Sequence, residues 1–392
     1  MKNTKLIFIS LMLGALVGCG GGGGSPAPVA QAPAPAPVTP PVVVAPTPTP
    51  KTPLPVLASS YLNAKASGLT ATTVPVLPAN AQREQITTTY ASADFFQDGT
   101  VSMVAVSAVF SANNVAGKVY FFKKDANGAW QDKTASMLKE TAGCISPRKV
   151  LVADFNGDSK PDVFIACHGI DVEPFPGENQ RVLLSQADGT YANNVVAFSG
   201  FVHSASAAEI TNKGYADIVI VDSANNKPTP VMLLNNKNGT FTADYSRFPK
   251  YDGRPAYTVE FVDFQKTGKF DVLLAGVDNS STGVVMPTTL LTNNGIGVYN
   301  TIAPVVFPDG AVNTGVLDLV YTQDALYLLR VNNSYKGSSI QKIDLKTKAS
   351  SVIFGQESFP TGKNGGAWLD WMIPVNGKLV SQDVEYGVSV AM

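Results

Sequence analysis

A repeat of about 55 residues limits the folds open to this chain more than any other feature of its sequence. Each copy contains a short apolar run, a polar loop and a second apolar run. The first acidic positions of the successive copies are Asp94, Asp154, Glu209, Asp263 and Asp318, and the last of these lacks a recognisable loop. Short β-branched runs on both sides of a polar turn predict a strand-loop-strand hairpin in each copy.

A second hairpin is predicted out of phase with the first. An apolar run leads into a glycine-containing turn, and an aromatic residue then starts the return strand, at Trp130, Tyr191, Phe241 and Tyr299. Two hairpins per repeat make a four-stranded unit, which cannot bury both of its faces alone. Radial packing of such units solves this problem. We therefore expect an all-β protein, a β-propeller of about six four-stranded blades, with seven smaller blades as the alternative.

The composition agrees with this class and argues against one kind of partner. The chain has 34 glycines, 27 prolines and only 15% charged residues, which favours a turn-rich β protein over a helical one. Its formal net charge is −1. Because no basic excess is present, we expect no nucleic-acid partner.

The loop that starts at Asp154 carries the strongest chemical signal. Oxygen-bearing side chains occupy its positions 1, 3, 5 and 9, which are Asp154, Asn156, Asp158 and Asp162. Three carboxylates and one amide oxygen around a common centre suit a hard cation, Ca²⁺ before Mg²⁺. An EF-hand is excluded because Ser159 stands where the sharp turn needs glycine and Ile165 stands where a bidentate glutamate belongs. An Asp/Asn-rich turn without metal is the alternative.

The same loop resembles the FG-GAP or VCBS repeat, a strand-loop-strand calcium unit of integrin α-chain propellers and of many bacterial surface proteins. The family motif is DxNxDxxxD, and DFNGDSKPD, from Asp154 to Asp162, matches each defined position. The resemblance implies a propeller fold, and it implies that the main-chain carbonyl of Lys160 is a further calcium ligand.

The other loops depart from this motif. The Asp94 loop has Phe96 at position 3, so we expect it to hold no metal. The Glu209 loop has Lys213 at position 5, and we expect its ammonium group to replace the cation by pairing with Glu209 and Asp217. One calcium ion per chain is therefore predicted, as a structural brace rather than a signal.

The beginning of the chain predicts export and lipidation. Residues 1–18 read as a signal peptide, because Lys2 and Lys5 precede an apolar run that is too short to span a bilayer. The sequence LVGC resembles a bacterial lipobox, which implies acylation of Cys19 by fatty acids such as palmitate; ordinary cleavage is the alternative. Gly20 in place of an aspartate favours an outer-membrane lipoprotein, facing the periplasm or the medium, with the lipid anchor as its one membrane contact.

A linker is expected next. Residues 19–55 change to a glycine run followed by proline, alanine, valine and threonine, a composition that forms no core and favours a semi-rigid polyproline II stalk. The propeller would then occupy residues 56–392. Residues 56–78 are expected to complete the last blade and close the ring, and a short helix over LNAKASGL within them is the alternative.

Two cysteines and two histidines surround the central hairpin. Cys144 and Cys167 are expected to form a disulfide in an oxidising envelope compartment, and a thiol nucleophile paired with His168 is the alternative. The two histidines of the chain, His168 and His203, each lie near a strand end.

The histidines belong to the candidate ligand face, which comprises His168, Asp171, Glu178 and His203. This face is either a metal or acid-base site, or a set of residues that hydrogen-bond loops. The insertion 170–180, which carries three acids and one aromatic residue, is the candidate recognition loop, or alternatively a solvated connection.

We expect a calcium-stabilised, lipid-anchored propeller that binds a protein or glycan in the envelope or outside it. The chain contains no phosphate-binding glycine loop, no nucleophile elbow and no HExxH motif. Some propellers that resemble this one are polysaccharide-acting enzymes, so a lyase, dehydratase or hydrolase is the alternative function. A purely structural envelope subunit is the third.

Overall fold

The structure, a computed structural model, describes residues 51–62, 89–108, 115–223, 229–251, 253–311, 314–332, 337–356, 369, 371–381 and 388–392. The predicted signal peptide, Cys19 and most of the predicted linker lie outside these residues. The chain divides into the units Met1–Thr49 and Pro50–Met392, and the second is described below. Among the described residues, no helix is long and apolar enough to cross a membrane.

Strands dominate the described residues, as predicted, and α2 (Thr134–Met137) is a short helix. The strands are β1 (Thr89–Ala93), β2 (Ser102–Val106), β3 (Val119–Lys124), β4 (Trp130–Asp132), β5 (Pro147–Ala153), β6 (Asp162–Cys167), β7 (Glu178–Ser185), β8 (Tyr191–Gly200), β9 (Val202–Ala208), β10 (Asp217–Asp222), β11 (Val231–Asn235), β12 (Phe241–Asp244), β13 (Ala256–Val262), β14 (Asp271–Asn279), β15 (Thr289–Leu291), β16 (Val305–Val306), β17 (Thr314–Tyr321), β18 (Ala325–Asn332), β19 (Ser338–Asp344), β20 (Ser350–Gln356), β21 (Ile373–Val375), β22 (Lys378–Ser381) and β23 (Val388–Ala391).

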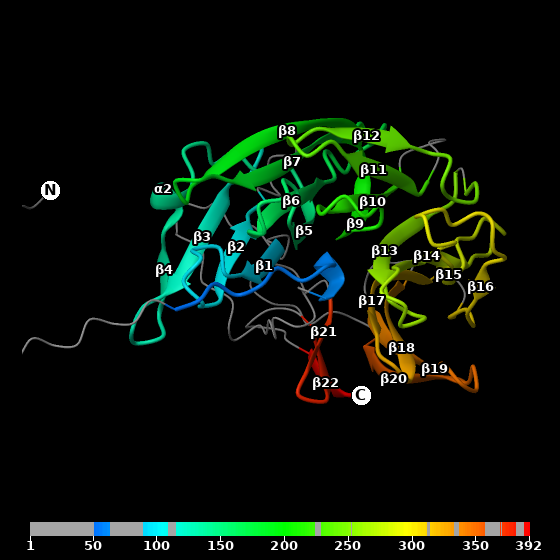
Figure 1. The fold of residues 1–392 in the computed structure, drawn as a ribbon. Helices are drawn as coiled ribbons and strands as arrows, with labels where there is room; N and C mark the ends of the chain where they lie inside the picture. Colours follow the sequence, from blue (N-terminus) through cyan, green and yellow to red (C-terminus); the bar gives the residue numbers. More distant parts are fainter. Residues whose placement is uncertain are drawn as a thin grey trace, which may run out of the picture. The chain divides into compact units, whose positions relative to one another are not determined.

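Neighbouring strands pair antiparallel in a propeller-like arrangement of sheets (Figure 1). The sheets β1–β4, β5–β8 and β9–β12 have four strands each, β13–β20 share an eight-stranded sheet, and β21–β23 form a three-stranded one. The first strands of consecutive repeats, β1, β5, β9, β13 and β17, contact one another in that order. The all-β class and the four-stranded repeat are therefore confirmed.

The number of separate sheets differs from the six or seven blades expected. In the described residues, four sheets have four strands or more. Two repeats merge because the long strand β14 continues beyond its own hairpin, so that Val277 and Asn279 pair with Gly315 and Thr314 at the start of β17. A sequence repeat does not reveal such a bond between units. Most of the segment expected to close the ring lies outside the described residues.

Successive sheets pack face to face, which explains why their central strands read as continuous apolar runs. All six residues of β6 are buried. Val163 and Ile165 join the cluster shared with the β1–β4 sheet, whereas Phe164 and Ala166 join the cluster shared with the β9–β12 sheet. Side chains alternate between the two faces of a strand, and both faces of β6 are covered.

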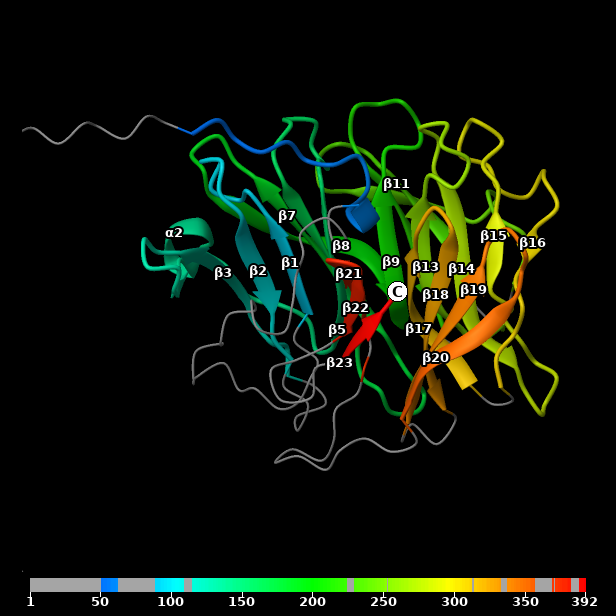
Figure 2. The same cartoon turned by 90° about the horizontal axis from the view of Figure 1, so that it is seen from below.

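Residues 51–62 form a strap at the loop ends of the first strands, drawn in blue in Figures 1 and 2. The Leu54 N–H donates to Asp94 Oδ2 at 2.9 Å. Ser59 forms a β-bridge with Ala208 at the end of β9. Tyr61 is buried, and its hydroxyl donates to the Tyr321 carbonyl at 2.8 Å. The described start of the predicted propeller thus ties the ends of β1, β9 and β17 together instead of extending the last sheet.

The strap supplies a first testable prediction. Gly99 has a φ of +74°, and a Cβ there would lie 2.5 Å from the Thr52 carbonyl oxygen of the strap. Gly128 has a similar φ of +81°, but a Cβ there meets nothing within 4 Å. Both alanine variants carry the left-handed penalty of about 1–2 kcal/mol, so the difference between them measures the strap contact alone.

We expect Gly99→Ala to unfold about 1–3 kcal/mol more easily than Gly128→Ala in urea, and to be cleaved faster by trypsin after Lys51. Equal stability and equal cleavage of the two variants would show that the strap adds nothing to the fold.

Candidate functional site

The Asp154 loop brings its acidic side chains to one place. Asp154 follows β5 and Asp162 begins β6, and the hairpin register pairs Ala153 with Asp162. Carboxylate oxygens of Asp154, Asp158 and Asp162 all lie within 4.8 Å of one another. Oxygens that share a Ca²⁺ ion at 2.3–2.6 Å are at most about 5 Å apart, so these three residues fit a calcium ion.

Backbone N–H groups hold the loop in this shape. Asp154 accepts the Gly157 N–H at 2.6 Å through Oδ1 and the Ser159 N–H at 2.7 Å through Oδ2. The Asn156 amide oxygen accepts the Asp158 N–H at 2.9 Å. Asp154 Oδ1 accepts two further N–H groups, those of Asn156 and Asp158, each at 3.2 Å. Asp154 Oδ2 and Asp162 Oδ1 each accept a single backbone N–H and so keep a lone pair for a cation.

The electrostatics of the loop also favour a cation. Burial raises the pKa of Asp162 to about 7, and the neighbouring Asp158 carboxylate contributes to the rise. Hydrogen bonds from the N–H groups of Ser185 and Phe155, at 2.7 and 2.8 Å, moderate this rise in the pKa of Asp162. The Ser185 hydroxyl donates to Asp158 Oδ2 at 2.8 Å. A divalent ion among these side chains would stabilise their charged forms.

The position 9 carboxylate has a structural role that does not need metal. In three successive repeats it accepts a backbone N–H at or just after the end of the third strand of the sheet. The pairs are Asp162 with Ser185 at 2.7 Å, Asp217 with Asn235 at 2.8 Å and Asp271 with Asn293 at 2.8 Å. This hydrogen bond explains why an acidic residue stands at position 9 even in loops that have few other metal ligands.

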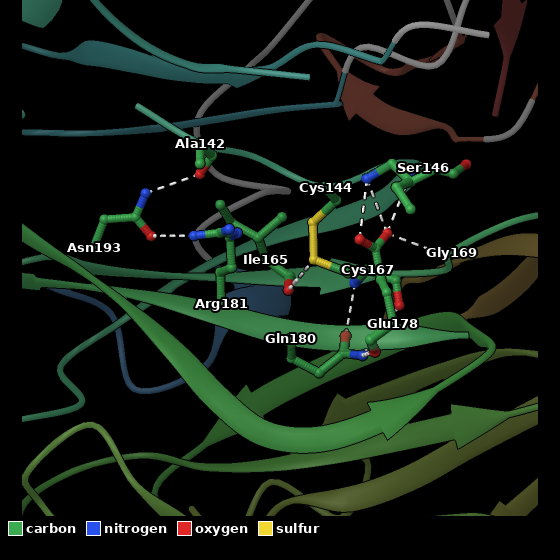
Figure 3. The surroundings of a disulfide bond; sticks show 11 residues. Ala142, Cys144, Ser146, Ile165, Cys167, Gly169, Glu178, Gln180, Arg181 and Asn193 are labelled. Atoms are coloured by element: carbon green, nitrogen blue, oxygen red, sulfur yellow. Dashed lines mark hydrogen bonds between the residues drawn. A yellow bond between two sulfur atoms is a disulfide. The ribbon is translucent and has the colours of Figure 1, made fainter. Parts of the chain in front are cut away.

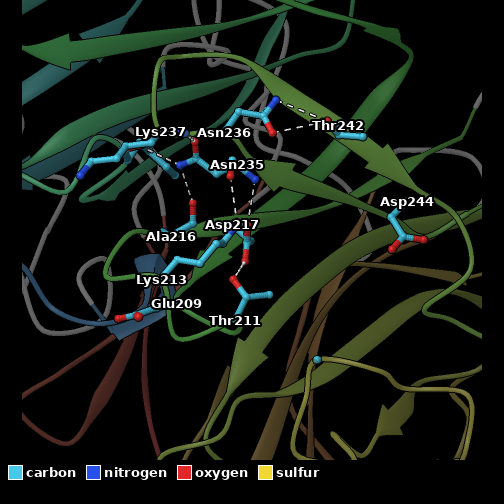
Figure 4. Close-up of polar contacts among 12 residues, drawn as sticks. Glu209, Thr211, Lys213, Ala216, Asp217, Asn235, Asn236, Lys237, Thr242 and Asp244 are labelled. Atoms are coloured by element: carbon cyan, nitrogen blue, oxygen red, sulfur yellow. Dashed lines mark hydrogen bonds and ion pairs between the residues drawn. The ribbon is translucent and has the colours of Figure 1, made fainter.

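Lysine ammonium groups lie in two of the degenerate loops. Lys213 Nζ lies 3.0 Å from Asp217 Oδ1 and donates to the Asn235 carbonyl at 2.9 Å (Figure 4). Glu209, the other expected partner of Lys213, instead accepts the Gly214 N–H at 2.7 Å. In the first repeat Lys123 pairs with Asp98. In each of these two loops a lysine thus places its positive charge beside an acidic side chain of the loop.

The two histidines meet at the opposite end of the same strands. His168 directly follows β6 and His203 lies in β9, and their Nε2 atoms are 3.2 Å apart. Arg148 Nη2, from β5, lies 3.4 Å from His168 Nε2 and 3.3 Å from Asp171 Oδ2. We call His168, His203, Arg148 and Asp171 the histidine cluster.

Glu178 does not join the histidine cluster. Its carboxylate accepts the N–H groups of Ile145 at 3.0 Å, Ser146 at 3.3 Å and Gly169 at 3.0 Å (Figure 3). These residues flank Cys144 and Cys167, which form a disulfide in the structure. Glu178 therefore holds the disulfide-bearing segments, and the bonded sulfurs offer no thiol to pair with His168.

Aromatic rings surround the histidine cluster. The His203 ring stacks on Tyr257 of β13, with centroids 4.9 Å apart. Phe201 contacts the His168 ring, and Phe175 packs on Phe201 with centroids 5.1 Å apart. The insertion 170–180 thus reaches the cluster through Asp171 and Phe175.

Sequence reasoning missed Arg148 and Tyr257, although the repeat contains the signal. Arg148, His203 and Tyr257 each stand six residues before the first acidic position of their own repeat. Aligning the repeats on that position would have placed them at equivalent points of β5, β9 and β13, which contact one another in succession.

Burial keeps both histidines neutral. It lowers the pKa of His168 well below the usual value, and the positive charge of Arg148 lowers it further. The same two causes lower the pKa of His203 to about 3. At neutral pH both rings are therefore uncharged, and at most one of the two Nε2 atoms in contact carries a proton.

Comparison with known proteins agrees with the architecture. Residues 94–165 match the FG-GAP-like repeat family, a stretch that runs from the first acidic loop into the second hairpin. No curated protein sequence matches the chain significantly.

Solved structures resemble the chain weakly. A proposed 6-phosphogluconolactonase from Bacteroides uniformis has 14% identity and a TM-score of 0.42, covering 74% of this chain and 83% of that one. The Dos1 propeller has 11% identity and a TM-score of 0.38 over 74% and 64%, and Kuenenia stuttgartiensis hydrazine synthase has 10% and 0.41 over 78% and 77%. Likenesses at this level say nothing about ligand or reaction.

Proposed function

We propose that this chain is a calcium-stabilised propeller of the FG-GAP kind that acts as a binding module for a protein or glycan. The observation that carries the proposal is the convergence of Asp154, Asp158 and Asp162, within the stretch that matches the FG-GAP-like repeat. A braced scaffold presents loops in defined positions, and recognition residues concentrate on such loops.

A lipid on Cys19 would hold this module at the outer membrane, at the end of the predicted stalk. This part of the proposal rests on the lipobox-like LVGC sequence and on the composition of residues 19–55. Mass spectrometry of the mature N-terminus tests it, because an acylated Cys19 carries the added mass of its fatty acyl chains.

The geometry of the histidine cluster favours binding over catalysis. Asp171 contacts Arg148, and Glu178 is engaged by backbone N–H groups. A catalytic base is typically held in orientation by a further polar group. Asp171 and Glu178, the two acids expected beside the histidines, contact Arg148 and backbone N–H groups instead. A polysaccharide-acting enzyme remains the second candidate, and incubation with a panel of acidic and neutral glycans, followed by product analysis, tests it directly.

Calcium should stabilise the folded protein. We expect that adding Ca²⁺ to the EDTA-treated, detergent-solubilised full chain at a hundredfold excess over Kd stabilises it by about 2.7 kcal/mol. Asp158→Asn should remove most of this gain, because it deletes one of the three converging carboxylates. Asp98→Asn is the matched control, since Asp98 is the position 5 residue of a loop in which Lys123 supplies the positive charge.

Denaturant melts with and without chelator measure the effect. A wild-type protein that is indifferent to Ca²⁺ would contradict the calcium brace, and equal losses in the two variants would place the ion elsewhere. Glycan-array and envelope-fraction binding, measured with and without Ca²⁺, then test the binding role separately.

A further inference from the structure

The two histidines of this chain face each other through equivalent nitrogens. His168 Nε2 lies 3.2 Å from His203 Nε2. A neutral imidazole carries its proton on one ring nitrogen, and the other nitrogen then holds a lone pair. Two lone pairs or two N–H groups would repel each other at this separation. One Nε2 atom therefore donates the hydrogen bond between the rings, and the other accepts it.

Arg148 decides which of the two nitrogens accepts. A guanidinium group can only donate, and Arg148 Nη2 lies 3.4 Å from His168 Nε2. A lone pair on His168 Nε2 can face both this group and an N–H of His203, whereas a proton there would lie beside the positive charge of the arginine. His168 therefore carries its proton on Nδ1, and His203 carries its proton on Nε2.

This arrangement leaves the Nδ1 atom of His203 as a hydrogen-bond acceptor. His203 is half-buried, and its ring is held by Tyr257 and Phe201, with centroids 4.9 and 5.4 Å away. No residue that the structure describes donates a hydrogen bond to this Nδ1 atom. Because the ring is fixed before a ligand arrives, little entropy is lost when the lone pair accepts a bond from outside.

Asp171 adds a second acceptor to the histidine cluster. Its Oδ2 atom lies 3.3 Å from Arg148 Nη2. Its Oδ1 atom receives no hydrogen bond within the described part of the chain, and the side chain is 51% exposed. An ionised carboxylate can only accept. His203 Nδ1 and Asp171 Oδ1 therefore both require a ligand that donates hydrogen bonds.

From this geometry we propose that the histidine cluster binds the hydroxyl groups of a neutral glycan, with His203 Nδ1 and the Asp171 carboxylate as acceptors. The inference rests on the proposed binding function and names its ligand class. Sugar hydroxyls supply the required donors, and the half-buried ring of Phe175 adds apolar surface from the insertion. A uronate or sulfated glycan would bring its negative charge against Asp171, which disfavours acidic glycans.

NMR spectroscopy of the untagged, detergent-solubilised full chain, labelled with ¹⁵N at histidine, tests the hydrogen-bond direction without a ligand. Because the chain has two histidines, their ring nitrogens account for all the imidazole signals. Near neutral pH we expect the proton of His203 on Nε2 and that of His168 on Nδ1. A proton on Nδ1 of His203 would overturn the proposal, since that atom could not then accept.

Binding to a glycan array, with excess Ca²⁺ present, tests the ligand class. We expect neutral glycans to bind in preference to acidic ones. His203→Phe removes the acceptor but keeps a ring against Tyr257, and Asp171→Asn removes the charge. Each should weaken binding about tenfold. Glu173→Gln is the matched control, because Glu173 is an exposed acid of the same insertion outside the histidine cluster, and it should bind as the wild type does.

Circular dichroism and melting establish that each variant is folded. Asp171→Asn keeps both histidines, so it tests the site even if His203→Phe unfolds. The inference is overturned if no neutral glycan binds, if acidic glycans bind better, or if the folded variants bind as tightly as the wild type. Binding of acidic glycans or of an envelope protein would retain the proposed binding module and remove only this ligand class.

Discussion

Replacing Asp278 with alanine should lower the free energy of unfolding by about 3–5 kcal/mol, because it leaves a buried arginine without its counter-charge. Asp278 lies in β14 and Arg330 in β18, so their ion pair links two repeats. Arg330 Nη2 and Nη1 donate to the two carboxylate oxygens at 2.7 and 2.9 Å. The exposed fractions of the two side chains are 3% for Arg330 and 0% for Asp278.

Equilibrium urea unfolding measures this loss, and the chain offers a matched control. Arg247 and Asp244 form an ion pair at 2.8 Å whose side chains remain 17% and 24% exposed. Asp244→Ala should therefore cost less than about 1 kcal/mol, as partly solvated pairs do. Similar losses in the two variants would show that burial does not set the importance of the Asp278 pair.

Acid should destabilise the metal-free protein through its histidines. The folded state holds both histidines neutral, because the pKa of His168 lies well below its usual value and the pKa of His203 is lowered to about 3. In the unfolded chain both are protonated below about pH 6.5. The unfolded state therefore binds more protons as the pH falls, so stability is full above pH 7 and decreases below 6.5. At pH 5 the two histidines together would account for up to about 4 kcal/mol.

The His168→Gln/His203→Gln double variant isolates this effect, because it removes all imidazole from the chain. We expect the wild type to lose more stability than the variant as the pH falls from 7 to 5, when both are measured in EDTA. Asp162 acts in the opposite sense. Its pKa of about 7 means that the folded state gains protons as the pH falls from 7, and this contribution cancels in the comparison. A difference that is constant with pH would contradict the prediction.

Local patterns in the sequence were sufficient for the class of fold and for the acidic loop. Apolar runs of four to six residues, separated by polar or glycine turns, allow few arrangements other than hairpins. Within one hairpin, Asp154, Asp158 and Asp162 are at most eight residues apart, so the turn alone brings their oxygens together. The all-β architecture is confirmed, and the metal that these residues would hold stays a prediction.

Contacts between repeats could not be predicted from such local patterns. The merging of two repeats depends on hydrogen bonds from Val277 and Asn279 to β17, which leave no local trace in the sequence. The two acids of the candidate ligand face, which were expected to lie together with the histidines, have separate partners. Asp171 contacts Arg148, while Glu178 contacts the segments joined by the disulfide.

Sequence alone thus determined the strands, their hairpins and the one loop with a full set of oxygen ligands, because these depend on residues that are close along the chain. Tertiary structure alone decided which distant side chains meet. The contact of His168 with His203 and the strap that joins Leu54 to Asp94 arise from the packing of one sheet on the next. Such packing is a property of whole surfaces, and no short stretch of residues specifies it.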